Sequence, residues 1–303
     1  MVTHLNITLE FHVSDEDLLQ FVNYLREEDS NKARPDQIEL DFQGHTTTRD
    51  EQDQAKNRLF KYVDPALLKK ETYKNFIALS DNFNRQTGIS EIETNEAIFI
   101  CLHLLNIIEK AEIDRFLQSL FTTKLWEDLY EFLHSKGHPF ATDRKTLFRW
   151  VKQLWFGFYS RSRGLADTSG FEHVFMGEIK NDEVSGMHSW LRFYLLERNA
   201  SENFDYKGFL IKRFEVMAAV KFSWWEQIKR SGSFMIGTSP EFDLAVFTLC
   251  FLSRRSRRTC DIEIDGCPVL ITSFDLPQRG KIFIGSIYPV AGRITESCRQ
   301  YHG

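Results

Sequence analysis

Hydrophobic residues in the first half of the chain recur at the spacing of an amphipathic helix. The clearest case is residues 14–28, where Leu18, Val22 and Leu25 fall on one face and Ser14 stands where it can cap the helix. The same periodicity predicts helices over residues 65–81, 91–111, 112–121, 123–136 and 143–159, and residues 37–43 favour a short extended segment. We therefore expect the first half to be mainly helical.

After residue 159 the pattern changes to short apolar runs rich in β-branched and aromatic residues, which indicates strands. We expect strands at 172–179, 184–193, 208–216, 233–237, 262–265, 268–273 and 281–287. One further helix is predicted over residues 240–254, with Thr238 or Ser239 as its cap and Pro240 at its first position.

Together these elements predict an α+β fold, in which a helical N-terminal part (1–142) precedes a part with small antiparallel sheets and flanking helices (143–303). No repeat or low-complexity linker separates the parts, so the boundary is soft and we expect one compact unit. The composition, with 42% apolar and 27% charged residues, is that of an ordinary soluble globular protein. No apolar run approaches the roughly 20 residues of a membrane span.

Two histidines, His173 and His188, flank a polar segment, residues 180–183, that is typical of a chain reversal. If the chain turns between Lys180 and Asn181, the histidines lie directly opposite each other on antiparallel strands, with Cβ atoms roughly 5 Å apart. Such a pair suits acid–base chemistry near neutral pH, because the unperturbed pKa of histidine is about 6.5. A purely structural pair explains the same pattern. A metal site is the third interpretation, although no third ligand lies at zinc-like spacing.

Charge is divided unevenly along the chain. The net charge is −5, but residues 1–144 carry −10 and residues 145–303 carry +5. The half that contains both histidines is therefore the basic half, which favours an anionic substrate there. A cluster of arginines in this half has two interpretations, favourable contact with a helix C-terminus or an RNA-facing surface. The cluster consists of Arg254, Arg255, Arg257 and Arg258.

The five cysteines form no CxxC pair and their number is odd, so we expect mostly free thiols in a reducing compartment. The alternative of one disulfide among the four C-terminal cysteines stays open; these are Cys250, Cys260, Cys267 and Cys298. The first residues show neither a basic region nor a continuous apolar segment, so no signal peptide is expected. These observations predict a cytoplasmic or nuclear location.

Several short blocks stand in a specific order in the second half of the chain. They are Ser-Gly-Phe-Glu-His-Val-Phe at 169–175, Gly-Met-His-Ser-Trp at 186–190, Gly-Ser-Phe at 232–234 and Gly-Thr-Ser-Pro-Glu-Phe at 237–242. These blocks resemble the EndoU (XendoU) family of uridylate-specific endoribonucleases. Segments at 72–76, 81–83 and 155–161 are also similar, and the resemblance covers roughly residues 15–292.

The resemblance implies catalysis by two histidines and a lysine. The histidines match His173 and His188, and the lysine falls best on Lys229, with Arg230 and Lys221 as the alternatives. By the same resemblance, His188 is the general base and His173 the general acid. Lys229 is expected to stabilise charge on the non-bridging phosphate oxygens.

Further residues receive binding or supporting roles from the resemblance. The related coronaviral nuclease has a hydroxyl residue, any residue, tyrosine and proline in succession, which matches residues 286–289 here. We expect Tyr288 to stack on uracil, and Ser286 or Ser233 to hydrogen-bond to its edge. Arg161 is expected either to contact phosphate or to order its loop. Supporting roles are expected for Glu172, Glu178 and Thr238.

The implied reaction is cleavage of single-stranded, uridine-containing RNA at uridylates by attack of the ribose 2′-OH, which leaves a 2′,3′-cyclic phosphate. Animal relatives imply dependence on Mn²⁺, with Ca²⁺ as the alternative, but no EF-hand loop or ligand-spaced cluster identifies the metal ligands. A monomer that does not attach to a membrane is expected. Two other interpretations compete: a non-catalytic RNA-binding protein with the same fold, and a protein-interaction module built on the acidic helical half.

Overall fold

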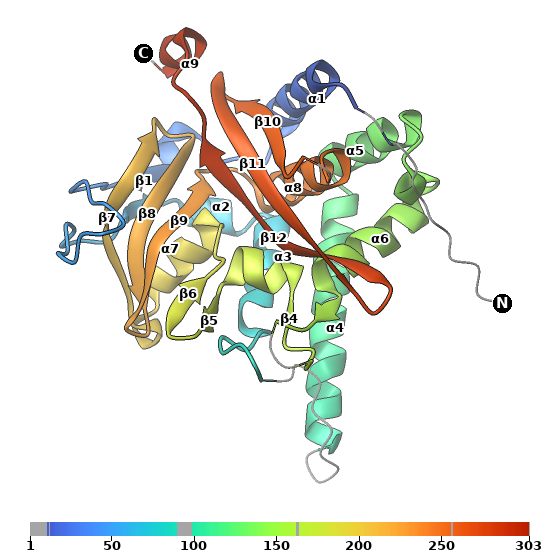
Figure 1. Ribbon diagram of the computed structural model, residues 1–303, viewed down its shortest axis with the longest axis horizontal. Coiled ribbons are helices and arrows are strands. Elements are labelled where there is room, and N and C mark those ends of the chain that lie inside the picture. The colour runs from blue at the N-terminus through green and yellow to red at the C-terminus, as the bar shows by residue number, and fades with distance from the viewer. Residues whose placement is uncertain (1–10, 12, 90–98, 162–163, 256, 303) are drawn as a thin grey trace.

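The computed structural model describes residues 11, 13–89, 99–161, 164–255 and 257–302. Figure 1 shows helices α4–α6 on one side of the molecule and a five-stranded sheet on the other, with strands β10–β12 between them. The helices include α1 (Asp15–Glu28), α2 (Pro65–Leu68), α3 (Glu71–Ala78), α4 (Phe99–Phe121), α5 (Lys124–Ser135), α6 (Arg144–Phe156), α7 (Trp190–Arg198), α8 (Pro240–Ser253) and α9 (Glu296–His302).

The strands form small sheets, as an α+β fold requires. The five-stranded sheet has the order β5-β6-β9-β8-β7, and the three-stranded sheet has the order β10-β11-β12. Two further pairs, β1–β2 and β3–β4, complete the sheets in the described part of the chain. The strands are β1 (Ile38–Leu40), β2 (Phe60–Val63), β3 (Phe158–Tyr159), β4 (Thr168–Ser169), β5 (Glu178–Lys180), β6 (Glu183–Ser185), β7 (Phe204–Arg213), β8 (Met217–Trp224), β9 (Gln227–Met235), β10 (Thr259–Ile264), β11 (Cys267–Gln278) and β12 (Lys281–Ala291).

The helical periodicity of the first half located its helices well. The helix predicted at 14–28 is α1, and the Ser14 side chain accepts a hydrogen bond from the Asp17 amide at 3.0 Å. The predicted helix 65–81 is broken into α2, α3 and a 3-10 turn at Leu79–Asp81. The helices predicted separately at 91–111 and 112–121 form one helix, α4, and residues 91–98 lie outside the described residues.

Helix α8 lies at the centre of the molecule (Figure 1), and its side chains from Pro240 to Leu252 are all buried. Ser239, one of the two predicted capping residues, caps it by accepting from the Phe242 amide. The indole Nε1 of Trp155 donates to the Thr248 hydroxyl at 2.9 Å, which ties α6 to this helix. Buried side chains from Val13 to Cys298 belong to the same hydrophobic cluster, so both halves of the chain share a core. Among the described residues, no helix combines the length and apolar character needed to cross a lipid bilayer.

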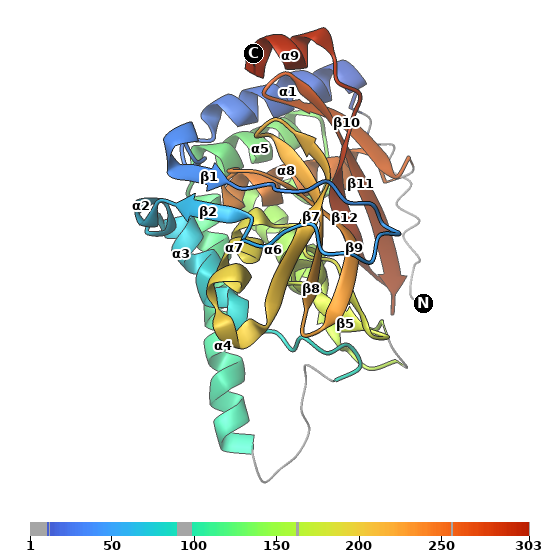
Figure 2. The same ribbon diagram turned by 90° about the vertical axis from the view of Figure 1, so that its left-hand side faces the viewer.

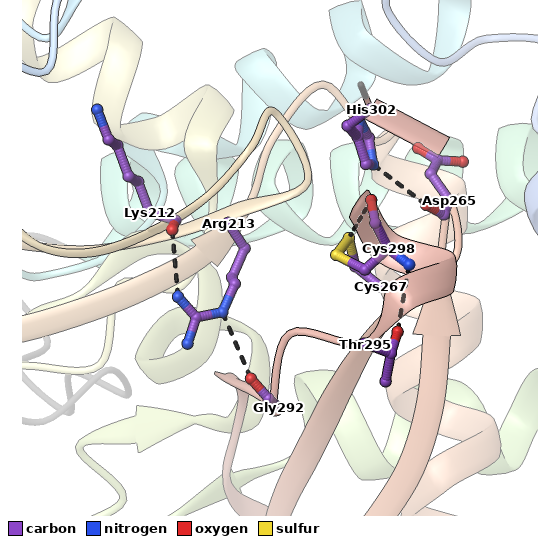
Figure 3. Close-up of a disulfide and its surroundings, with 8 residues drawn as sticks. All are labelled: Lys212, Arg213, Asp265, Cys267, Gly292, Thr295, Cys298 and His302. Carbon is purple, nitrogen blue, oxygen red and sulfur yellow. Dashed lines mark hydrogen bonds between the residues drawn. A yellow bond between two sulfur atoms is a disulfide. The ribbon is translucent and has the colours of Figure 1, made fainter. Parts of the chain in front are cut away.

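The expectation of mostly free thiols is wrong, because four of the five cysteines form disulfides. Cys250 of α8 is bonded to Cys260 of β10, and Cys267 of β11 is bonded to Cys298 of α9. Figure 3 shows the second disulfide, which ties the C-terminal helix to the three-stranded sheet. The sequence did not reveal these pairs, because the partners are 10 and 31 residues apart and meet only in the folded chain.

Candidate active site

A pocket of about 400 Å³ lies between the five-stranded sheet and strand β12. Both histidines singled out by the sequence line it, together with Lys229 on β9 and Tyr288 on β12. The remaining lining residues are Ser185, Gly186, Ile211, Met217, Ala219, Ser231, Ser233, Ser286, Pro289, Val290 and Ala291. Six of the ten predicted site residues therefore meet in one place, although they come from segments more than 100 residues apart.

The predicted hairpin does form, but it does not contain the histidines. Strands β5 and β6 pair with Ile179 opposite Val184, so the turn is centred on residues 181–182, one residue later than predicted. His173 instead lies in a π-helical turn, Glu172–Met176, and His188 precedes α7. The strands predicted at 172–179 and 184–193 are therefore wrong over most of their length. Apolar content alone does not distinguish a buried helical turn from a buried strand.

Backbone hydrogen bonds bring the two histidines together instead of strand pairing. The Met187 amide donates to the His173 carbonyl at 3.0 Å, and the His188 amide donates to the Val174 carbonyl at 2.6 Å. Gly186 permits this approach, because a Cβ atom at that position would lie 1.7 Å from the His173 carbonyl oxygen. Gly186 also has a φ of 69°, a conformation that glycine adopts without strain.

His173 is held between a carboxylate and a hydroxyl group. Its Nδ1 lies 3.1 Å from Oε2 of Glu178, and its Nε2 lies 3.2 Å from the Ser286 hydroxyl. Since an ionised carboxylate only accepts, Nδ1 donates to Glu178. Burial lowers the pKa of His173, and the Glu178 charge opposes that effect. The pKa of Glu178 is lowered because the charges of His173 and Arg161 outweigh its burial, so Glu178 is ionised.

His188 has a different set of neighbours. Its Nδ1 donates to the Ser233 carbonyl at 2.8 Å, which fixes the proton on Nδ1 in the neutral ring. The pKa of His188 lies well below its ordinary value because the ring is buried and because the Lys229 ammonium is near. Its ring also stacks on Tyr288, with centroids 5.2 Å apart. His188 is therefore held neutral, with Nε2 available to accept a proton.

Of the three cationic candidates, Lys229 is the one that lines the pocket. Burial lowers the pKa of Lys229 to about 8, so its ammonium remains mostly charged at neutral pH. Lys221 is buried, and its ammonium donates to the Thr47 and Asp50 carbonyls. Arg230 is exposed and donates to the Thr48 carbonyl at 3.2 Å. Both of these side chains hold the loop at 47–50.

Arg161 lies behind the pocket, where it contacts Glu178 and the neighbouring backbone. Its Nε is 3.7 Å from Oε2 of Glu178, and its Nη2 donates to the Tyr159 hydroxyl and to the Gly285 carbonyl. Thr168 also donates to Glu178. The sequence did not single out Thr168. These contacts favour an ordering role for Arg161 over direct contact with phosphate.

Glu172 and Thr238 are also outside the pocket lining. Glu172 is fully buried, its carboxylate accepts from the Ser169 amide, and its own amide donates to the Ser169 hydroxyl, so it orders the start of the π-helical turn. The Thr238 carbonyl accepts from Nε1 of Trp190 at 2.7 Å, which fixes the segment before α8 against α7. The two residues shape the site from outside.

No metal ligand set accompanies this arrangement. Within the residues that the structure describes, no group of three or more His, Cys, Asp or Glu side chains could hold a metal ion. The two histidines instead bind Glu178, Ser286 and a backbone carbonyl. The described residues therefore identify no ligand set for the metal ion that the resemblance implies.

Comparison with known proteins gives consistent matches over most of the chain. The family model "Endoribonuclease XendoU" matches residues 17–289. The chain is 33% identical over 290 residues to a uridylate-specific endoribonuclease of Bos taurus, covering 92% of this chain and 66% of that protein. It is 34% identical over 278 residues to uridylate-specific endoribonuclease C of Xenopus laevis, covering 86% of this chain and 85% of that protein.

The fold comparison agrees with these matches. A solved structure of XendoU, described as a splicing independent snoRNA processing endoribonuclease, superposes with a TM-score of 0.71. The alignment covers 91% of this chain and 97% of that structure, at 28% sequence identity. The likeness therefore extends through the helical part as well as through the part that contains the pocket.

Proposed function

This chain belongs to the XendoU endoribonuclease family, and from that premise we propose that it is an endoribonuclease that cleaves single-stranded RNA at uridylates. The observation that carries the proposal is the pair of histidines in one pocket, each with its Nδ1 occupied by a different kind of acceptor. The difference between the two acceptors supports the assignment of one histidine as general base and the other as general acid.

His188 is the general base of the proposed reaction. Its Nδ1 is bound to a carbonyl, so its lone pair is on Nε2, and its lowered pKa keeps the ring neutral. Nε2 takes the proton of the ribose 2′-OH as the 2′-oxygen attacks the adjacent phosphorus. A new bond forms between phosphorus and the 2′-oxygen.

His173 is the general acid. The Glu178 carboxylate accepts from Nδ1 and favours the imidazolium form, so Nε2 can carry the proton that the leaving 5′-oxygen requires. The bond between phosphorus and the 5′-oxygen breaks, and the product is a 2′,3′-cyclic phosphate. No water is consumed in this transesterification.

Lys229 stabilises the negative charge that accumulates on the non-bridging phosphate oxygens. A compact ammonium in a partly buried pocket interacts strongly with a dianionic phosphorus centre, because little water screens the charges. Its effect is greater in the transition state than in the ground state, where the phosphate carries less charge.

Uracil recognition is proposed for the wall formed by Ser233, Ser286 and Tyr288, all of which line the pocket. Tyr288 offers a ring face for stacking, and the two serines offer hydroxyl groups for the uracil edge. The Pro289 ring after Tyr288 restricts the backbone there, so little freedom is lost when a base binds.

Mn²⁺ remains a proposed activator, with Ca²⁺ as the alternative, and no reaction step is assigned to either ion. A monomeric state is likewise a proposal.

The two disulfides favour an oxidising compartment, whereas the sequence predicted a cytoplasmic or nuclear location, where thiols are usually reduced. Labelling of free thiols in protein isolated from its native source tests this location, because full labelling would support a reducing compartment.

The proposed function is tested by incubating the protein with an oligonucleotide that contains one uridine among other bases. The expected product ends at the uridine in a 2′,3′-cyclic phosphate, which mass spectrometry detects. His173→Ala and His188→Ala should each lower the rate by about 10²–10⁴-fold. His45→Ala, which changes an exposed histidine outside the pocket, should be as active as the wild type.

The assay also separates the competing interpretations. Binding of the oligonucleotide without a cyclic phosphate product would support a non-catalytic RNA-binding protein. Equal rates for His173→Ala and wild type would reject the assigned site. Arms with chelator, Mn²⁺ and Ca²⁺ decide whether a metal ion activates cleavage.

A further inference from the structure

Four arginines lie in the segment between α8 and β10, and we call Arg254, Arg255, Arg257 and Arg258 the arginine loop. The disulfide between Cys250 and Cys260 closes this segment, because it joins the last turn of α8 to the second residue of β10. The Ser273 amide donates to the Arg258 carbonyl at 2.8 Å, so β11 holds the end of the loop. The loop is thus fixed at both ends.

The arginine loop has more positive charge than its neighbours neutralise. Arg254 is buried and pairs with Asp15, which Arg257 also contacts, and Arg255 pairs with Asp275. In the part of the chain that the structure describes, three of the four arginines thus share two carboxylates, and Arg258 lies over the Phe274 ring. Arg255, Arg257 and Arg258 are exposed, and the ion pairs of Arg255 and Arg257 are at the surface.

A run of ring contacts connects the arginine loop to the candidate active site. The guanidinium of Arg258 lies 5.4 Å from the ring centroid of Phe274. Phe274 stands opposite Ser286 in the β11–β12 pairing, and its ring is 6.4 Å from that of Tyr288. The Tyr288 ring in turn stacks on His188. Arg258 is therefore linked through Phe274 to Tyr288 in the wall of the pocket.

We propose that the arginine loop binds the phosphates of nucleotides that flank the cleaved uridylate, through Arg255, Arg257 and Arg258. This inference rests on the proposed function, because it extends the RNA strand out of the same pocket. Arg254 has a different role: it is buried against Asp15 and anchors the loop.

The chemistry of the loop suits an RNA backbone better than a single small anion. Guanidinium groups bind phosphate oxygens in a bidentate manner, and three exposed groups in a short segment can follow successive phosphates. Exposed ion pairs such as those of Arg255 and Arg257 contribute only about 0–1 kcal/mol, so a phosphate can displace Asp275 or Asp15 from them.

The test compares two substrates. One is a dinucleotide with a 5′ uridine, which occupies only the pocket. The other is an oligonucleotide of about 16 nucleotides with one central uridine, near the upper end of single-strand site sizes. The variant R255Q/R257Q/R258Q should cleave the dinucleotide like the wild type. With the longer RNA, its KM should rise, and the slope of log KM against log salt concentration should fall by about 0.7 for each phosphate that the variant no longer binds.

Two matched variants control the comparison. R255K/R257K/R258K keeps the charge and should retain most of the wild-type salt dependence. K61Q/K69Q/K74Q removes three exposed charges from β2, from the end of α2 and from α3, and should behave like the wild type. These elements lie across the molecule from β10 in Figure 2. Two of these lysines, Lys61 and Lys74, also pair with carboxylates, as Arg255 and Arg257 do.

The outcomes separate this inference from the proposed function. Failure of the wild type to cleave either substrate would refute the proposed function. The arginine loop is tested independently by binding of the longer RNA with 2′-deoxyuridine at its centre, which lacks the attacking hydroxyl. Equal affinity and salt dependence for wild type and R255Q/R257Q/R258Q in that measurement, or an equal loss of affinity in K61Q/K69Q/K74Q, would overturn the inference.

Discussion

At the scale of single residues, the two histidines of the pocket differ in what their Nδ1 atoms bind. His188 donates to the neutral carbonyl of Ser233, and His173 donates to the ionised carboxylate of Glu178. A carboxylate stabilises imidazolium and a carbonyl does so much less, so the pair is biased toward one base and one acid. The predicted assignment of His188 as base and His173 as acid remains a prediction, which this difference supports.

Glu178→Gln tests that bias. The glutamine can still accept from Nδ1, but the charge that raises the pKa of His173 against the effect of burial is lost, so this pKa should fall. Because the acid must be protonated, the alkaline limb of the profile of kcat/KM against pH should move to lower pH. If the limb moves by about one pH unit, the rate at a given pH on it falls about tenfold.

In Glu178→Gln, the profile of kcat/KM should therefore shift along the pH axis while the protein stays folded. Glu71→Gln, which removes a surface carboxylate outside the pocket, is the control and should leave the profile unchanged. An alkaline limb that stays in place in Glu178→Gln would remove His173 from the role of acid.

Base selection is a second residue-scale prediction. Tyr288→Ala should slow cleavage at every site by roughly 5–150-fold, because stacking contributes about 1–3 kcal/mol per base. Tyr288→Phe keeps the ring and should change the cleavage rate only slightly. Ser286→Ala should relax the preference for uridine over cytidine, since one neutral hydrogen bond contributes about 1 kcal/mol. A product ladder from RNA with all four bases is the measurement. An unchanged ladder in Ser286→Ala and full activity in Tyr288→Ala would place the uracil site elsewhere.

At the scale of elements, the π-helical turn at 172–176 and the segment at 186–188 act as one unit. Two backbone hydrogen bonds and the close approach of Gly186 to His173 join them. Met187, next to Gly186, has a positive φ of 61° in this arrangement. The short hairpin β5–β6 connects the two segments and fixes their separation. The positions of both histidine rings therefore depend on this close backbone contact.

Gly186→Ala should disrupt this unit. The added methyl group would overlap the His173 carbonyl, so residues 186–188 must move away and His188 with them. We expect kcat to fall by at least tenfold, since small misplacements of catalytic groups cost about 10²-fold. Gly137→Ala is the matched control, because its φ of 72° imposes the same backbone strain while nothing lies within 4 Å of the added atom. Equal activities of the two variants would show that the contact at Gly186 is unimportant for catalysis.

At the scale of the whole molecule, the disulfides join the C-terminal third of the chain into one unit. One ties α8 to β10, and the other ties β11 to α9, which follows directly on strand β12 of the pocket wall. Further contacts around the second disulfide include the hydrogen bond from Arg213 to the Gly292 carbonyl (Figure 3). The end of β12 is therefore supported from both sheets.

Cys267→Ser combined with Cys298→Ser should lower the free energy of unfolding by about 4 kcal/mol, from the loop-entropy relation for a 31-residue separation. Denaturant unfolding with and without reductant is the measurement. The wild type should lose stability in reductant, whereas a variant with serine at all four bridged positions should be insensitive to it. A wild-type midpoint that does not change in reductant would argue against stabilisation by the disulfides.

The sequence by itself determined the elements whose signals are local. Helix α1 follows from apolar periodicity and its cap Ser14, and helix α8 from the capping position of Ser239 and from Pro240 at its start. The family resemblance singled out the two histidines and Lys229, which line one pocket. Capping and periodicity act within a few residues, so they can be read from the chain. The resemblance also favoured Lys229 over Lys221 and Arg230, and of these three residues Lys229 lines the pocket.

Only the tertiary structure decided the features that join distant segments. A buried segment such as 172–176 can pair its backbone N–H and C=O groups either in a strand or in a helical turn. Packing and the close contact of Gly186 with His173 favour the helical turn here. The disulfides, the contact of Ser286 with His173 and the placement of Arg161 behind Glu178 likewise depend on which surfaces meet. Periodicity carries no information about these contacts, because it records which face of an element is buried and not what covers it.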